Sequence, residues 1–137
     1  MHHRSYCPVN LALEVFGDKW SLLIVRDLLL AGKSSFRELL CSEEKIATNI
    51  LQDRLEKLEQ EGIIVRVQDE NHKQKYNILL TKKGIDLLPI LVLISEWGLK
   101  HTPVDDEHRA FARKTMPRTD EKMKKIRALL LKRLNSV

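Results

Sequence analysis

Four polar side chains, Thr48, Asn49, Gln52 and Asp53, lie close together in the chain and are suited to hydrogen-bond chemistry. The amides of Asn49 and Gln52 each donate and accept at once, which matches the major-groove edge of adenine. A good pair of this kind gives roughly 1–3 kcal/mol of discrimination between bases. The sequence therefore offers Thr48, Asn49 and Gln52 for contact with base edges in DNA. The alternative is that they form the solvated face of an ordinary amphipathic helix.

Asp53 lies on or beside the same face and allows two interpretations. It can accept a hydrogen bond from a cytosine amino group, or it can orient Arg54 or Lys57. We favour the second role.

Basic and hydroxyl side chains near this segment could hold the phosphates beside a groove. Phosphate contacts position a protein on a duplex without reading its sequence. We predict phosphate or wing contacts for Lys33, Ser35, Arg37, Arg54, His72, Lys73 and Lys75.

The histidines and cysteines form no pattern typical of a metal site. The five histidines are scattered, and the two cysteines, Cys7 and Cys41, lack the paired spacing of zinc ligands. An enzyme built around Cys7 would lack a recognisable base and oxyanion site, and no Gly-rich phosphate loop is present. We expect no metal, no cofactor and no enzymatic activity. We place Cys41, which follows Leu39 and Leu40, in or near the core.

The composition bounds the class of protein. With 137 residues, of which 43% are apolar and 31% charged, the chain fits one domain of common size. Its formal charge of +5 favours a polyanionic partner. No run of about 18 apolar residues exists, and the N-terminus lacks the apolar core of a signal peptide. We expect a soluble, cytoplasmic protein that does not associate with membranes.

The apolar spacing predicts the elements that position these side chains. Ser35 and Glu38 form a capping box for a short helix, and Gly62 closes the helix that carries the four polar residues. That helix turns Ile50, Leu51, Leu55 and Leu58 inward. Helices are predicted over residues 10–31, with an interruption near Gly17, over 36–41, and over 47–61. Strands are predicted over 63–70 and 75–81, joined by a polar turn at 71–74.

Further helices follow the hairpin. Thr81 caps a helix predicted over 81–101, in which Pro89 either bends the helix or begins its continuous part. Its apolar residues lie almost all the way round, so it needs burial on more than one side. The fold class is mainly α with a β-hairpin (α+β), a winged helix-turn-helix domain with additional helices, which the family resemblance described below makes dimerisation helices.

We divide the chain into a winged-helix domain, residues 1–104, and a charged C-terminal extension, residues 105–137. The extension ends in a basic helix with an apolar stripe. The stripe consists of Met123, Ile126, Leu130 and Leu134. Because a lone helix of this length is marginal in water, it should dock on the domain, on a second subunit or on an anionic surface.

The segment from Cys7 to His101 resembles the HxlR branch of bacterial winged-helix transcription regulators, which are relatives of the MarR type. The resemblance is carried by CPVNLALEVFGDKW, SFRELL, ILQDRLEKLEQEGIIVR, KYNILLTKKGIDLLPIL and EWG, in that order. It implies a homodimer that binds pseudo-palindromic operator DNA. Carried onto this sequence, it makes 47–61 the recognition helix and 64–80 the wing, with a dimer surface from the first helix and the helix after Thr81. A two-fold dimer would place the recognition helices about 34 Å apart.

Three positions depart from the family pattern. Ala47 stands where the family often has a serine cap, Glu43 and Glu44 make the turn between the helices acidic, and Asp53 adds a carboxylate.

Some family members sense oxidants or electrophiles through an N-terminal cysteine, which here is Cys7. Arg4 and His2 or His3 could lower its thiol pKa. The alternative is a small buried thiol that packs the dimer surface.

We interpret the chain as a homodimeric, sequence-specific transcription regulator whose partners are double-stranded DNA and a small-molecule or electrophile effector. The alternative is a winged-helix module that docks protein partners.

Overall fold

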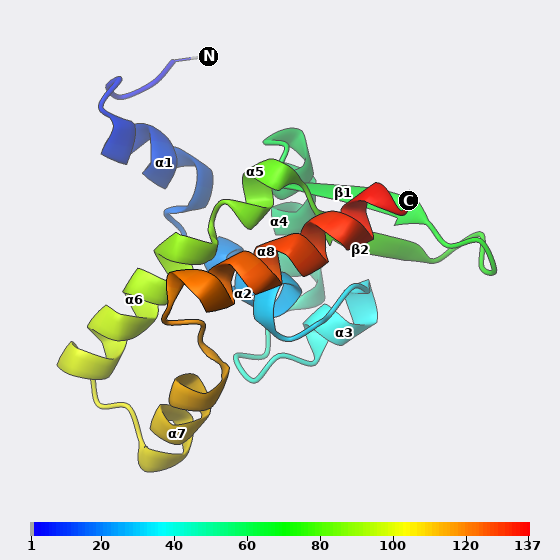
Figure 1. The fold of residues 1–137 in the computed structure, drawn as a ribbon. Coiled ribbons are helices and arrows are strands. Elements are labelled where there is room, and N and C mark those ends of the chain that lie inside the picture. Colours follow the sequence, from blue (N-terminus) through cyan, green and yellow to red (C-terminus); the bar gives the residue numbers. More distant parts are fainter. Residues whose placement is uncertain (1) are drawn as a thin grey trace.

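Within residues 2–137, which the computed structural model describes, the chain forms eight helices and one two-stranded hairpin (Figure 1). Short loops connect most of these elements, and the hairpin extends away from the helical body. The elements follow in the order α1 (Pro8–Phe16), α2 (Ser21–Leu30), α3 (Phe36–Leu40), α4 (Thr48–Gln60), β1 (Ile64–Gln68), β2 (Tyr76–Leu80), α5 (Lys82–Ile85), α6 (Leu88–His101), α7 (Asp106–Thr115) and α8 (Asp120–Asn135). The predicted fold class, mainly α with a winged hairpin, is confirmed.

The capping residues define the ends of the helices around α3 and α4. The backbone N–H of Glu38 donates to Ser35 Oγ at 3.1 Å, as a capping box requires. The Glu38 carboxylate accepts from the N–H of Ser34, one residue before the cap, at 3.2 Å. Gly62 has a φ of +74°, a left-handed conformation that suits glycine at a helix C-terminus.

The apolar stripe of α4 packs into the core as predicted. Leu51 is fully buried, Leu55 and Leu58 are each 1% exposed, and Ile50 packs against the same cluster. Side chains from α2, the hairpin and α6 complete this core. The burial fixes which face of α4 is turned outward.

The hairpin is antiparallel, with Ile64 opposite Leu80 and Gln68 opposite Tyr76. The N–H of Ile78 donates to Ser34 O at 2.7 Å, which ties β2 to the loop before α3. At the base of the hairpin, the Thr81 hydroxyl accepts from the N–H of Gly84 at 3.1 Å and so caps α5.

Gly84 lies where a side chain has no space. A Cβ at this position would lie 2.3 Å from Ile63 O and 2.8 Å from Leu80 Cδ2. The Thr-x-x-Gly sequence therefore combines a cap with a close approach of α5 to the start of β1.

The long helix predicted after Thr81 is divided into α5 and α6. Pro89 lies in the first turn of α6, where its missing N–H costs no hydrogen bond. Of the two predicted effects of this proline, the start of a continuous helix is the one observed. One face of α6 is buried through Leu88, Leu91 and Val92.

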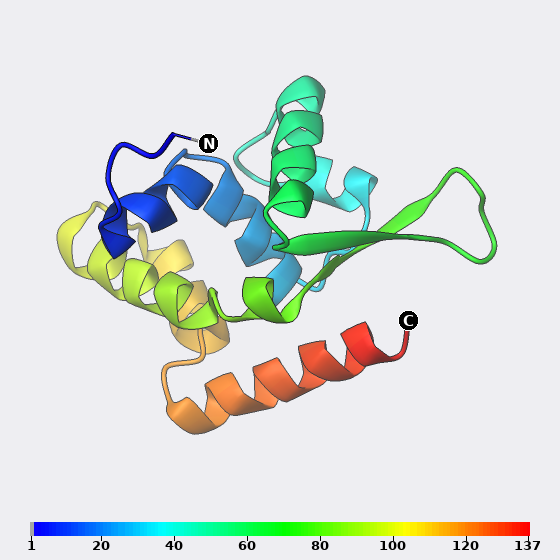
Figure 2. The same cartoon turned by 90° about the horizontal axis from the view of Figure 1, so that it is seen from above.

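The C-terminal residues form two helices, of which α7 was missed from the sequence. Asp105 caps α7, its carboxylate accepting from the N–H of His108 at 2.8 Å. The second helix, α8, packs Met123, Ile126 and Leu130 against the core. It lies along α5 and β2, on the opposite side of the molecule from α4 (Figure 2). Of the three docking sites proposed for this helix, the domain itself is the one observed.

Candidate nucleic-acid interface

The N-terminal half of α4 presents the predicted base-reading residues. Thr48, Asn49, Gln52 and Asp53 are all exposed. Ala47 occupies the N-cap without any side-chain hydrogen bond, so the first amides of α4 have no side-chain cap. Figure 2 shows α4 and the hairpin as two separate projections from the helical body, with the Thr48 end of α4 pointing outward. This arrangement can present amide and hydroxyl groups to a groove while the hairpin lies beside it.

Asp53 is paired within α4. Its carboxylate lies 2.5 Å from Arg54 Nη1 and 3.5 Å from Lys57 Nζ. This geometry corresponds to the orienting role that we favoured for Asp53.

Arg54 connects α4 to the turn between α1 and α2. Its Nε donates to Asp18 Oδ1 at 3.1 Å. Burial opposes ionisation of Asp18, but hydrogen bonds from Ser21, Trp20 and Arg54 outweigh it and lower the pKa of Asp18 to about 2. The hydrogen bond to Asp18 in turn raises the pKa of Arg54. Arg54 is therefore held by two carboxylates, and a phosphate contact would have to compete with them.

Lys33 is turned toward the protein interior. Its Nζ donates to Asp27 Oδ2 at 3.2 Å and to Ser42 Oγ at 3.1 Å. Asp27 is only 5% exposed, so the lysine compensates a buried carboxylate. We predicted a phosphate contact for Lys33. In this structure its ammonium group is already paired with Asp27, so a phosphate would have to compete with that carboxylate.

Arg26 and Glu44 extend this network, which sequence reasoning missed. The Arg26 guanidinium donates to both oxygens of Glu44 at 2.8 Å and also contacts Asp27. The hydrogen bond to Glu44, reinforced by Asp27, raises the pKa of Arg26 despite its burial. The available signal in the sequence was Asp27, the one acidic residue within the apolar run of α2, which would need a cationic partner if buried. The network fixes the α3–α4 turn, residues 41–47, against α2.

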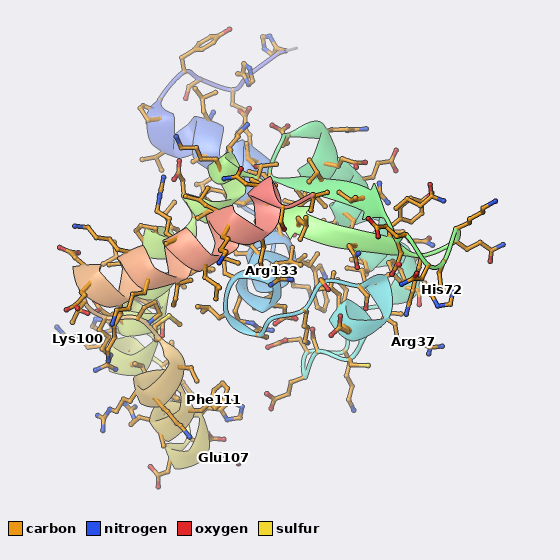
Figure 3. All side chains as sticks on the ribbon, turned by 45° about the vertical axis from the view of Figure 1, so that its right-hand side comes forward. Arg37, His72, Lys100, Glu107, Phe111 and Arg133 are labelled. Atoms are coloured by element: carbon orange, nitrogen blue, oxygen red, sulfur yellow. The ribbon has the colours of Figure 1, made fainter. Side chains whose placement is uncertain are left out.

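Other predicted backbone contacts remain accessible. Arg37 is exposed on α3, and within residues 2–137 its guanidinium has no carboxylate partner. His72, Lys73 and Lys75 are exposed near the tip of the hairpin, whereas Ser35 is half-buried as a helix cap. Figure 3 shows Arg37 and His72 at the same end of the molecule. Arg37 and the hairpin residues therefore remain accessible to phosphates, whereas Lys33 and Arg54 are already paired with carboxylates of the protein.

Cys7 is exposed and occupies the N-cap of α1. Hydrogen bonds from the backbone N–H groups of Asn10 and Val9 lower its pKa. None of the cations that we named for this effect is among its causes, and two of them have other partners, since Arg4 donates to Asn10 and His3 contacts Glu14.

Cys41 is also exposed, so its predicted place in the core is wrong. The helix α3 ends at Leu40, and Cys41 is its C-cap, where the chain turns toward solvent.

The helices α1 and α6 lie at the end of the molecule opposite the hairpin (Figures 1 and 2). Both helices leave apolar side chains exposed. No residue of α1 is buried, although most of the helix is apolar. The exposed residues are Tyr6, Val9 and Leu13 on or before α1, and Leu93, Ile94 and Trp97 on α6. Trp97 alone is 63% exposed. Apolar patches of this kind mark protein–protein interaction sites.

Within residues 2–137, no group of histidine, cysteine, aspartate or glutamate side chains is arranged to hold a metal ion. None of the helices in this range has the length and apolar character needed to span a bilayer.

The chain resembles known proteins over most of its length. Residues 15–106 match the family model for the HxlR-like helix-turn-helix. The HTH-type transcriptional regulator YdeP of Bacillus subtilis is 32% identical over 95 residues, which cover 69% of this chain and 73% of YdeP. YybR, an HTH-type transcriptional regulator of the same organism, is 31% identical over 79% of this chain and 86% of YybR.

Solved structures agree with these relationships. The redox regulator HypR in its oxidized form superposes with a TM-score of 0.62 and 32% identity, covering 72% of this chain and 100% of HypR. The reduced form of the transcriptional regulator YodB from B. subtilis superposes with a TM-score of 0.60 and 26% identity, covering 74% of this chain and 100% of YodB. The exposed polar face of α4, the hairpin beside it and these matches together show that the chain belongs to the HxlR-like helix-turn-helix family of transcriptional regulators.

Proposed function

We propose that the protein is a homodimer that regulates transcription by binding pseudo-palindromic operator DNA through two copies of α4. The observation that carries this proposal is the division of α4. Leu51, Leu55 and Leu58 are buried, while Asn49 and Gln52 are exposed. Burial of one face leaves the amide groups no role in the fold of the described chain, and a major groove admits one α-helix.

Base reading and backbone binding are assigned to different residues. Asn49 and Gln52 contact base edges, with Thr48 beside them, while Arg37 and the hairpin lysines hold phosphates. Residues 2–104 carry as many acidic as basic side chains, so the excess positive charge lies in the extension. Specificity in this arrangement depends on a few local contacts rather than on the net charge of the winged-helix domain.

The dimer forms through α1 and α6. A helix that is largely apolar and buries none of its residues, such as α1, needs a partner surface. Leu93 and Trp97 on α6 supply exposed apolar area at the same end of the molecule. A two-fold arrangement would place the two α4 helices about 34 Å apart, one turn of DNA.

Cys7 is the residue through which a thiol-reactive signal acts. HypR is named as a redox regulator, and in this chain Cys7 is exposed at the start of α1 with a lowered pKa. An adduct at this position would change the packing of α1 in the dimer. Alkylation with iodoacetamide should therefore change the affinity for DNA in the Cys41→Ser variant and leave it unchanged in Cys7→Ser.

Selection of bound genomic fragments followed by footprinting tests the proposal. The recovered half-sites should be separated by about one turn of DNA. Asn49→Ala or Gln52→Ala should relax base preference at one operator position, while Lys73→Ala should weaken binding to all sequences and reduce the salt slope by about one unit. Equal losses on operator and random DNA for all three variants would contradict the assignment. Absence of any salt-sensitive retention of DNA would favour a protein-docking module instead.

A further inference from the structure

A groove of about 1040 Å³ separates α7 from the rest of the protein. Its walls come from α2, from the α3–α4 turn, from the C-terminal half of α6 and from α7. Ligand sites in proteins are usually about 300–1,000 Å³, so the groove is large enough for a drug-sized molecule. The matched family segment ends at residue 106, the first residue of α7, so the rest of this helix lies outside it.

The wall formed by α7 is attached through few contacts. His108 Nε2 lies 3.0 Å from Glu43 in the α3–α4 turn, and Arg109 Nη2 donates to Leu99 O on α6 at 3.2 Å. The hydrogen bond to Glu43, followed by that to Asp105, raises the pKa of His108 to about 9. No residue of α7 is fully buried. The helix can therefore shift to admit an occupant at little cost in packing.

The charges of the groove determine which ligand it suits. Arg26 is bound by Glu44 and Asp27, and Lys33 is bound by Asp27 and Ser42. The third cation in the lining, His108, is charged at neutral pH because its pKa is raised to about 9, and it is paired with Glu43 and Asp105. All three cations are therefore already neutralised by the protein. In contrast, the Glu107 carboxylate has no hydrogen-bond or ion-pair partner in the part of the chain that the structure describes. An anion would find no available cation, whereas a cation would find a carboxylate.

The remaining wall is apolar and aromatic. Phe111 lines the groove and is 64% exposed, one helical turn beyond Glu107 (Figure 3). Leu30 on α2 and Leu99 on α6 contribute aliphatic surface. The exposed face of an aromatic ring attracts organic cations, and residues four apart on a helix can contact the same ligand.

We propose that this groove binds an amphipathic organic cation, whose charge lies against Glu107 and Phe111 and whose apolar body fills the space between α2, α6 and α7. The site would also influence DNA binding, and this second effect rests on the function proposed above. Glu43 and Glu44 line the groove and belong to the turn that leads into α4. A ligand that displaces α7 from Glu43 would alter the support of that turn, and the effect of the ligand on DNA affinity would be reciprocal.

Isothermal titration with two ions of matched size and shape tests the site without DNA. Tetraphenylphosphonium carries a positive charge and tetraphenylborate a negative one. We expect the cation to bind at least threefold more tightly than the anion. This outcome is a stringent one, because the net charge of +5 would favour the anion at a nonspecific site. Equal affinities, or a preference for the anion, would overturn the proposal.

Amino-acid substitutions test whether the cation binds in this groove. Glu107→Gln should weaken tetraphenylphosphonium binding about two- to fivefold, as expected for an exposed charge pair, and Phe111→Leu should weaken it by a similar factor. Asp106→Asn is the matched control, since it removes an exposed carboxylate of the same helical turn that does not line the groove. Equal effects of Asp106→Asn and Glu107→Gln would overturn the assignment. Binding that appears only in a monomeric Trp97→Lys variant would show that a second copy covers the groove and would equally overturn it. If the unmodified protein binds the cation but shows no binding to DNA, the proposed function is refuted while the cation site stands.

Discussion

Replacement of Gly84 with alanine should lower the free energy of unfolding by about 1–2 kcal/mol. The added methyl group would lie 2.3 Å from Ile63 O and 2.8 Å from Leu80 Cδ2. The leucine can rotate, but the carbonyl cannot move freely, because it accepts from the N–H of Thr81 at 2.9 Å. Overpacking of this kind costs about 1–3 kcal/mol, and the better helix propensity of alanine returns at most about 1 kcal/mol.

Urea unfolding at a fixed protein concentration measures the effect. With a slope of about 1.5 kcal/mol per molar urea, the midpoint should fall by about 1 M while the slope stays constant. Gly98→Ala is the matched control, since the nearest atom to a Cβ there is Thr102 Oγ1 at 3.9 Å. This control lies within α6 and should be neutral or stabilising by up to about 1 kcal/mol. An unchanged midpoint for Gly84→Ala would show that α5 can move away from β1 without cost, and would refute the role assigned to this glycine.

Three further outcomes follow from the charged groups. The pKa of His108 is raised to about 9 in the folded protein, so the attachment of α7 should weaken as the pH rises from about 6.5 to about 9. Hydrogen exchange of the α7 amides measures this attachment. In His108→Gln the weakening over this pH range should be absent. The lowered pKa of Cys7 should shift its alkylation by iodoacetamide, followed by mass spectrometry, to a lower pH than that of free cysteine. Lys33→Met should reduce stability in thermal melts by about 1–3 kcal/mol because it leaves Asp27 less compensated, whereas Arg37→Ala should change it by less than about 0.5 kcal/mol. Equal effects of the last two changes would contradict the inward role of the lysine.

The sequence predicted the elements whose signals are local. The spacing of the leucines in α4, the Ser35 cap and the glycine after the helix each determine structure within a few residues, and all three agree with the structure. The helix α7 was missed because its apolar residues are few. Its remaining signal was the cap at Asp105 with acidic residues in the first turn and basic residues in the last.

The partners of the charged side chains could not be predicted in the same way. Arg54 pairs with an aspartate 36 positions earlier, and Ser42 contacts one 15 positions earlier. Periodicity identifies which face of a helix is polar, but it does not identify the carboxylate that a given cation meets across the fold. For that reason the sequence places Asn49 and Gln52 on the surface, as the structure does, whereas only the structure shows that Lys33 is turned inward toward Asp27.

The position of α8 along β2 has a consequence for self-association. A hairpin of two strands has open edges, and unpaired strand edges are templates on which other chains add strands and aggregate. Here the N–H of Ile78 on β2 donates to Ser34 O, and α8 contacts β2, with Leu130 and Arg133 bordering the same small cavity as Leu79 and Leu80. The C-terminal helix thus covers part of the strand β2. We expect a chain shortened to end before Thr119 to leave this strand open to pairing with strands of other molecules.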